Sequence, residues 1–204
     1  MLSWLNWKVT YKTMNHIQKL IQELCPDGVE WKKLGEVCEI KRWESMTKKN
    51  VIEGNIPVIS GWRGPAYFHS KHNRLGKTIT IAGSGAYAGF VMYWEIPIFV
   101  NDAFSLQSEW NINMKYVYHL LKKDQNLIHS MKQGSGVPHV YPKDVWNIKI
   151  PLPPLEIQRE IVKILDSFNT LVNNLTDWLP AEIAARRQQY EYYREKLLTF
   201  PEKQ

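Results

Sequence analysis

Residues 151–200 read PLPPLEIQREIVKILDSFNTLVNNLTDWLPAEIAARRQQYEYYREKLLTF, a long helical pattern that begins after paired prolines. Pro180 lacks a backbone N–H, which a helix tolerates only in its first turn, so we expect two helices or one sharply kinked helix. The first part carries apolar side chains at alternating steps of four and three, the seam that a partner helix packs against: Ile157, Ile161, Ile164, Phe168, Leu171, Leu175 and Trp178. This spacing favours an assembly arm over an ordinary terminal helix packed on its own domain.

The second part of the arm carries a more polar seam. Its members are Ile183, Arg187, Tyr190, Arg194 and Leu197. Arginines stand where a dry core would have leucine, so we expect this seam to meet a polar partner surface or a loosely packed helix. An exposed helix face is the alternative interpretation.

The rest of the chain has the composition of a globular domain. The 204 residues are 44% hydrophobic and 12% aromatic, enough for one sizeable core with an appendage. Cys25 and Cys38 have no CxxC spacing, which indicates neither a disulfide framework nor a zinc ribbon and favours a reducing, cytoplasmic location. Residues 1–14 lack the pattern of a signal peptide and are expected to be an upstream extension or disordered.

The globular part mixes helical and β patterns. Helical spacing is expected over 15–24 and 116–129. Short β-rich runs between Gly, Pro, Asn and Ser turns predict strands at 57–59, 78–82, 89–94, 97–100 and 145–150. The uncharged run 78–94 is interrupted by glycines and fits two buried strands around a turn better than a membrane span. We therefore predict an α+β fold: a globular domain over 15–152, a helical coiled-coil arm over 153–200 and a tail over 201–204.

The net charge of +6 is concentrated in the globular part. Residues 1–150 hold 19 basic and 12 acidic side chains, whereas residues 151–204 hold 7 basic and 8 acidic ones. A polyanion is the natural partner of such a domain, although a solvated charged face is the common alternative.

Catalytic and metal-binding patterns are weak throughout the chain. Asp27, Glu30 and Lys32 resemble a metal-nuclease motif. In that motif the two carboxylates lie on adjacent strands, and the two residues between Asp27 and Glu30 are too few to connect such strands. The glycine loop 83–89 has no lysine and precedes a strand, so a tight turn is favoured over a phosphate cradle. His69 and His72 lack supporting metal ligands. We predict no catalytic residue and no metal site.

Four segments interleave basic residues with aromatic and amide groups: 41–44, 61–64, 67–74 and 132–139. Such segments can neutralise phosphates and reach base edges, which predicts a DNA-binding surface. Together with the glycine loop and the basic stretch from Lys41 to Lys77, they supply the candidate DNA-binding residues Lys41, Arg42, Lys48, Lys49, Arg63, Tyr67, His69, Lys71, His72, Arg74, Ser84, Tyr87, Lys132, Gln133, Ser135 and His139.

Several of these segments resemble the specificity subunits of type I restriction-modification systems. The match includes GVEWKKLGEV at 28–37, GNIPVI at 54–59 and GSGVP at 134–138, and it is most specific in IKIPLPPLEIQ at 148–158 and RRQQYEYYREKLL at 186–198. Where the family commonly has Glu-Gln after the Pro-Pro-Leu element, this chain reads Glu-Ile-Gln. Residues 60–130 match loosely, as expected of the segment that sets which DNA sequence is read.

The resemblance implies a target recognition domain that reads one half of a bipartite DNA site, followed by a helical spacer. Family members typically have two such domains and two spacers in an antiparallel coiled coil, whereas this chain has one of each. We therefore expect a homodimer, paired through the arm, that reads a palindromic split site. The resemblance also implies that catalysis lies in partner subunits: a methyltransferase that uses S-adenosylmethionine to methylate adenine, and a motor-nuclease restriction subunit. The chain itself is expected to need no cofactor, and its polar seam is the candidate dock for the methyltransferase.

Two other classes of protein compete with this interpretation. A self-sufficient enzyme would need methyltransferase motifs, which the sequence lacks. An interaction protein or decoy would bind the methyltransferase without productive DNA recognition. Steep weakening of DNA binding with salt separates a specificity subunit from both.

Overall fold

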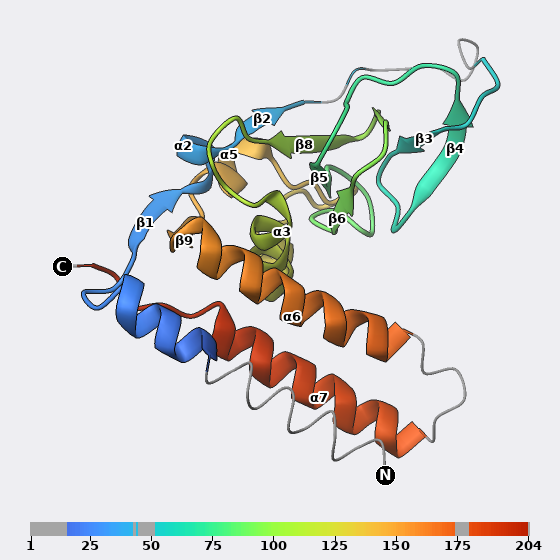
Figure 1. Cartoon of the computed structure of the whole chain (residues 1–204). Coiled ribbons are helices and arrows are strands. Elements are labelled where there is room, and N and C mark those ends of the chain that lie inside the picture. Colours follow the sequence, from blue (N-terminus) through green and yellow to red (C-terminus); the bar gives the residue numbers. More distant parts are fainter. Residues whose placement is uncertain (1–15, 43, 45–51, 174–179, 204) are drawn as a thin grey trace. The chain divides into compact units, whose positions relative to one another are not determined.

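The computed structural model describes residues 16–42, 44, 52–173 and 180–203 and mixes helices with short strands, as predicted (Figure 1). The chain divides into two compact units, one formed by residues 1–31 and 151–204 and the other by residues 32–150. We call the second the recognition unit and the first the arm unit. The predictions for 1–14, Lys48, Lys49, Leu175 and Trp178 lie outside the described residues, as do the side chains of Leu171 and Ile183.

A four-stranded antiparallel sheet is the centre of the recognition unit. Its strand order is β2-β8-β5-β6, with β2 at Glu39–Lys41, β8 at Ala103–Gln107, β5 at Thr78–Ala82 and β6 at Val91–Trp94. The alternating Thr and Ile residues of β5 suit a pleated strand, and all five of its residues are buried. The predicted pair of strands around the glycine turn is thereby confirmed.

A second sheet has the strand order β4-β3-β7, with β4 at Pro65–His69, β3 at Ile56–Ile59 and β7 at Phe99–Val100. The β3–β4 pair is antiparallel, and the β3–β7 pair is parallel. A hydrophobic cluster joins residues of both sheets: Ile59, Met92, Ile98, Val100 and Ala103. Strands β2, β4 and β8 were not predicted, because β4 reads as a basic and aromatic loop and β8 is too buried to show alternation.

Short helices connect these strands: α2 at Leu34–Val37, α3 at Met114–Lys123, α4 at Gln125–Ser130 and α5 at Pro142–Trp146. The predicted helix over 116–129 is thus two helices. The predicted strand over 145–150 was wrong at its start, because Pro142 opens a helical turn that continues to Trp146. Strand β9, at Lys149–Leu152, follows and pairs with β1, at Glu30–Lys33.

The arm unit contains a helix over 16–24 and two long helices, α6 at Leu155–Asn173 and α7 at Pro180–Leu197. Of the two expected alternatives, the structure has two helices, with Pro180 opening the second. They pack on each other (Figure 1), since the Phe168 ring stacks on Tyr193 at 5.4 Å and meets Tyr190 edge-on at 6.5 Å.

The first apolar seam is therefore covered within the chain. Ile157 and Ile161 are fully buried, and Ile164 and Phe168 are 7% and 6% exposed. At Phe168 the helix that packs on this seam is α7 of the same chain. The predicted coiled coil with a second copy stays a prediction.

Most of the polar seam of α7 also turns inward. Tyr190 contacts Phe168, the Arg194 guanidinium lies 5.5 Å from the Tyr190 ring centre, and Leu197 is buried. Burial raises the pKa of the Tyr190 hydroxyl, against the opposing effect of Arg194. Only Arg187 is exposed among the described side chains of this seam. Along the part of the chain that the structure describes, no helix is both long and apolar enough to cross a membrane.

The residues after α7 form backbone hydrogen bonds with Val29. The Val29 N–H donates to the Pro201 carbonyl at 3.1 Å, and the Lys203 N–H donates to the Val29 carbonyl at 3.0 Å. Gly28 has a φ of +89°, and a Cβ there would lie 2.8 Å from the Pro201 oxygen. Glycine is therefore required at this turn.

Replacing Gly28 by alanine is expected to destabilise the protein by roughly 1–2 kcal/mol, the cost of a left-handed backbone for a residue with a Cβ. Urea denaturation measures the loss. Gly64→Ala is the matched control, because a Cβ at Gly64 meets nothing within 4 Å and its φ is not positive. Equal losses for the two variants would contradict the requirement at Gly28.

Candidate nucleic-acid interface

The glycine loop 83–89, between β5 and β6, is a rigid turn held by two other segments. The Gly85 N–H donates to the Pro138 carbonyl at 2.9 Å, and the Val140 N–H donates to the Gly83 carbonyl at 3.0 Å. The Ser84 hydroxyl is bonded to the Asp102 carboxylate. The loop is therefore a tight turn where backbone approaches backbone, the interpretation favoured from sequence.

Two cations and three aromatic rings gather over this loop. The Arg63 guanidinium lies 4.7 Å from the Tyr87 ring centre and 5.5 Å from that of Phe90. The Lys122 ammonium lies 4.7 Å from the Phe90 ring, and the Trp62 and Tyr87 rings are 5.8 Å apart. We call Trp62, Arg63, Tyr87, Phe90 and Lys122 the cation–aromatic cluster. Trp62 is 62% exposed, so the cluster offers both charge and an aromatic face to a partner.

A third cation joins the cluster from the segment 132–139. The Lys132 ammonium donates to the Ala86 carbonyl at 3.1 Å. Gln133 and His139 exchange backbone hydrogen bonds of 2.9 and 2.8 Å, and the His139 ring stacks on Tyr141. Ser135 is exposed between them. The structure thus brings together six of the predicted DNA-binding residues: Arg63, Ser84, Tyr87, Lys132, Gln133 and His139.

His129 lies close to these cations, and their charges affect its pKa. Its Nδ1 is 3.0 Å from the Ala88 carbonyl oxygen, to which a protonated Nδ1 donates. Burial lowers the pKa of His129, the Ala88 bond opposes this, and the charges of Lys132, Lys122 and Arg63 lower the pKa further. Arg63, Lys122 and Lys132 gather near one imidazole, and such a grouping of positive charges suits an anion.

Because folding lowers the pKa of His129, the unfolded chain binds its proton more readily than the folded chain does. This contribution to stability is present above the ordinary histidine pKa, about 6.5, and is lost as pH falls below it. We expect His129→Gln to reduce the loss of unfolding free energy between pH 7 and pH 5. Urea titrations at both pH values measure it, and an unchanged loss would contradict the assignment.

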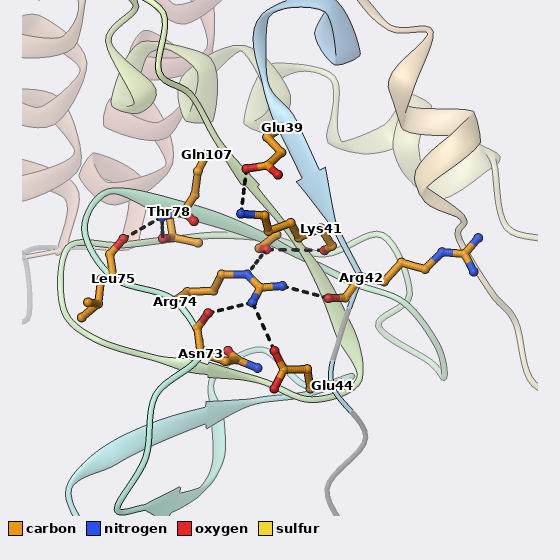
Figure 2. A network of polar contacts seen from close by, with 10 residues as sticks. Glu39, Lys41, Arg42, Glu44, Asn73, Arg74, Leu75, Thr78 and Gln107 are labelled. Atoms are coloured by element: carbon orange, nitrogen blue, oxygen red, sulfur yellow. Dashed lines mark hydrogen bonds and ion pairs between the residues drawn. The ribbon is translucent and has the colours of Figure 1, made fainter.

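Arg74 was predicted to contact DNA, but the structure places it in the interior, and that prediction is corrected. Its side chain is 6% exposed, and Figure 2 shows it enclosed by polar groups. Nε donates to the Ser105 hydroxyl at 2.6 Å, Nη1 to the Asn73 carbonyl at 2.7 Å and Nη2 to the Arg42 carbonyl at 2.8 Å. The Glu44 carboxylate lies 4.0 Å away. Burial lowers the pKa of Arg74, and Glu44 and Glu39 oppose this.

His69 is corrected for the same reason. It is 2% exposed, its ring meets Phe99 edge-on at 5.7 Å, and its Nδ1 lies 2.8 Å from the Ile52 carbonyl oxygen and 3.1 Å from the Ile52 nitrogen. Either tautomer finds a partner on the Ile52 backbone. The side chain therefore holds the end of β4 in place, and its burial keeps it from contacting DNA.

The remaining predicted residues lie on other elements of the recognition unit. Lys41, on β2, forms an exposed ion pair with Glu39 at 2.8 Å (Figure 2). Arg42 follows it with an exposed side chain, while its carbonyl serves Arg74. Tyr67 is half-buried on β4, and the structure leaves Lys71 and His72 exposed after that strand.

Sequence reasoning missed Trp62, Phe90, Lys122 and His129 as members of the site. Trp62 lies within the basic and aromatic segment 61–64, which was a usable signal. Lys122 and His129 belong to α3 and α4, and helical spacing does not tell which loop a helix covers. Within the described ranges, no group of three or more His, Cys, Asp or Glu side chains could hold a metal ion.

Fold and site together define a mixed α/β module with a basic, aromatic surface, the kind of surface that nucleic-acid-binding domains carry. A family model described as the type I restriction modification DNA specificity domain matches residues 26–185, and the chain belongs to this family. The resemblance inferred from the sequence segments is confirmed.

Two curated relatives match this chain over about half of their own length. It is 31% identical over 217 residues to the specificity subunit of the type I restriction enzyme EcoR124I/EcoR124II of Escherichia coli, covering 93% of this chain and 53% of that protein. It is also 31% identical over 173 residues to a putative type I specificity subunit of Mycoplasma pneumoniae, covering 81% and 56%. The chain spans about half the length of these curated relatives. Specificity subunits are the non-catalytic components of type I systems, in agreement with the predicted absence of an enzymatic role.

Solved structures share the fold. The S subunit of a type I restriction-modification system from M. genitalium aligns with a TM-score of 0.63 at 21% identity, covering 72% of this chain and 41% of that one. The HsdS subunit from Thermoanaerobacter tengcongensis aligns with a TM-score of 0.60 at 22% identity, covering 97% and 53%. At this low sequence identity, the structural similarity shows a shared fold and nothing further.

Proposed function

We propose that this chain recognises one half of a bipartite double-stranded DNA site and directs type I modification and restriction to it. The observation that carries the proposal is the gathering of Arg63, Lys122 and Lys132 beside an exposed tryptophan over a braced glycine loop. Residues 32–150 hold 16 basic and 9 acidic side chains, a net charge of +7, which supports a polyanionic ligand.

Different side chains of this surface suit different parts of DNA. Lys122 and Lys132 are point charges suited to phosphates, whereas Arg63 and Gln133 can make paired hydrogen bonds to guanine and adenine edges. Ser84, Tyr87, Ser135 and His139 complete this surface in the proposal. The exposed Lys41, Arg42, Lys71 and His72, with Tyr67, remain proposed contacts outside it. Lys48 and Lys49, which lie outside the described residues, remain proposed contacts from the sequence.

Catalysis is proposed to lie in partner subunits, because the family is one of DNA specificity domains. We propose that a methyltransferase subunit and a restriction subunit assemble with this chain, that S-adenosylmethionine binds on the methyltransferase, and that Arg187 belongs to the docking face. The family match supports DNA specificity and gives no support to a decoy that never recognises DNA.

Reconstitution with a type I methyltransferase subunit tests the proposal. Genomic DNA treated with the complex and S-adenosylmethionine is sequenced by a single-molecule method that reports methyladenine. A split motif methylated only in the presence of this chain is expected. Methylation that is absent, or that has the same pattern without this chain, would refute the function.

Two copies are proposed to associate through the arm, so that each reads one half of a symmetric site. Since α7 already contacts α6 at Phe168, we propose that pairing exchanges α7 between copies. A Phe168→Cys, Tyr193→Cys variant treated with a short bismaleimide then yields covalent dimers at low concentration. Cross-linking only within single chains, with a monomeric mass in light scattering, would refute the exchange.

A further inference from the structure

A groove of about 450 Å³ opens on the recognition unit around α2, and none of its lining residues belongs to the cation–aromatic cluster. It is lined by residues 35–40 and by Glu109, Trp110 and Trp146. A volume of this size accepts one long side chain with its neighbours.

The tryptophans of the groove are held in place while remaining open to solvent. A Cβ at Gly35 would lie 1.9 Å from Cδ2 of Trp146, so the indole ring rests directly on the α2 backbone. The backbone N–H of Trp110 donates to the Ser108 hydroxyl, which in turn donates to the Val37 carbonyl. Trp146 is nevertheless 43% exposed and Trp110 54% exposed. The Trp146 ring and the backbone of Trp110 are therefore positioned before any partner arrives.

The charge of the groove is opposite to that of the unit around it. Three exposed carboxylates line it, those of Glu36, Glu39 and Glu109. Lys41, which pairs with Glu39 at 2.8 Å, and Lys32 border the groove, and an incoming cation competes with Lys41 for Glu39. The unit as a whole carries a net charge of +7. DNA phosphates are repelled by such a lining, whereas a cation gains both the carboxylates and the aromatic rings. The Lys32 ammonium, 4.8 Å from the Trp110 ring centre, shows that this ring already attracts a cation.

We propose that this groove docks a partner protein through an arginine-bearing segment. The guanidinium stacks on the exposed indole of Trp146 and pairs with Glu39 and Glu109, and flanking apolar residues cover Trp110. Arginine suits this role better than lysine, because its planar group stacks on aromatic rings and pairs with carboxylates through two parallel hydrogen bonds. The recognition unit would then hold DNA on one surface and a protein on another.

The probe is the peptide acetyl-Gly-Leu-Arg-Leu-Gly-amide, titrated into the full chain labelled with 5-fluorotryptophan and followed by ¹⁹F NMR. Resonances of the two groove tryptophans are assigned with Trp110→Phe and Trp146→Phe variants. We expect saturable shifts of these two resonances, and at least fivefold weaker binding of a matched peptide with citrulline in place of arginine. A Glu39→Gln, Glu109→Gln variant should lose a similar factor.

The alternatives give distinct results. Equal binding of the arginine and citrulline peptides, or unchanged binding by the Glu39→Gln, Glu109→Gln variant, would overturn the proposal. Shifts of the two groove resonances by a DNA duplex but not by the peptide would assign the groove to DNA and overturn it as well. Circular dichroism of each variant establishes that it is folded.

Discussion

Changing Arg63, Lys122 and Lys132 together to glutamine is expected to weaken DNA binding about 300- to 10,000-fold at ~0.1 M salt. Lys122 and Lys132 each release close to one counterion on contacting a phosphate, so their loss removes about 0.9 decades each at this salt concentration, and losing the proposed base-edge contact of Arg63 costs about 1–3 kcal/mol more. The slope of log Kd against log salt should fall by about two. Fluorescence anisotropy with a labelled duplex between ~0.05 and ~0.3 M salt measures both quantities.

Glutamine is chosen because it keeps part of the side-chain stem over Tyr87 and Phe90 while removing the charge. The matched control changes three exposed cations of the arm unit, Arg159, Lys163 and Lys203, to glutamine. Net charge falls equally in both variants. A similar loss of affinity in the two would mean that overall charge, and not the cluster, attracts DNA.

The sequence predicted the helices of the arm but not what covers them. The steps of four and three over α6 correctly indicate a buried seam, and Pro180 correctly begins a second helix. Such spacing predicts that another helix packs on the seam, but it does not predict whether that helix belongs to the same chain or to a second one. The contact of Phe168 with Tyr193, between helices of one chain, depends on a reversal that periodicity does not encode.

Candidate DNA contacts were harder to sort, because residue type alone does not reveal burial. Arg63 and Arg74 both stand in basic, aromatic segments, yet Arg63 is exposed and Arg74 is buried. The partners of Arg74, Ser105 and Arg42, are 31 and 32 residues away in sequence, and only the pairing of β2 with β8 brings them together. Lys122 joins Arg63 in the same long-range manner, through Phe90.

Replacing Arg74 by methionine is expected to destabilise the protein by about 1–3 kcal/mol, the cost of leaving buried hydrogen-bond acceptors without their donor. Methionine fills a similar volume but leaves the Ser105 hydroxyl and the Asn73 and Arg42 carbonyls without the guanidinium donor. Since whole domains are stable by only about 5–15 kcal/mol, this loss is a large fraction of the total stability. The midpoint of urea denaturation measures the loss.

Arg42 supplies the matched control, because its side chain is exposed and only its carbonyl serves the network. Arg42→Met should change stability by no more than about 0.5 kcal/mol. As a proposed phosphate contact, it should instead reduce the salt slope of DNA binding by about one. Arg74→Lys, which keeps the charge but loses the planar fork, should be less stable than wild type and more stable than Arg74→Met. If Arg74→Met denatures at the wild-type midpoint and weakens only DNA binding, Arg74 is a DNA contact after all.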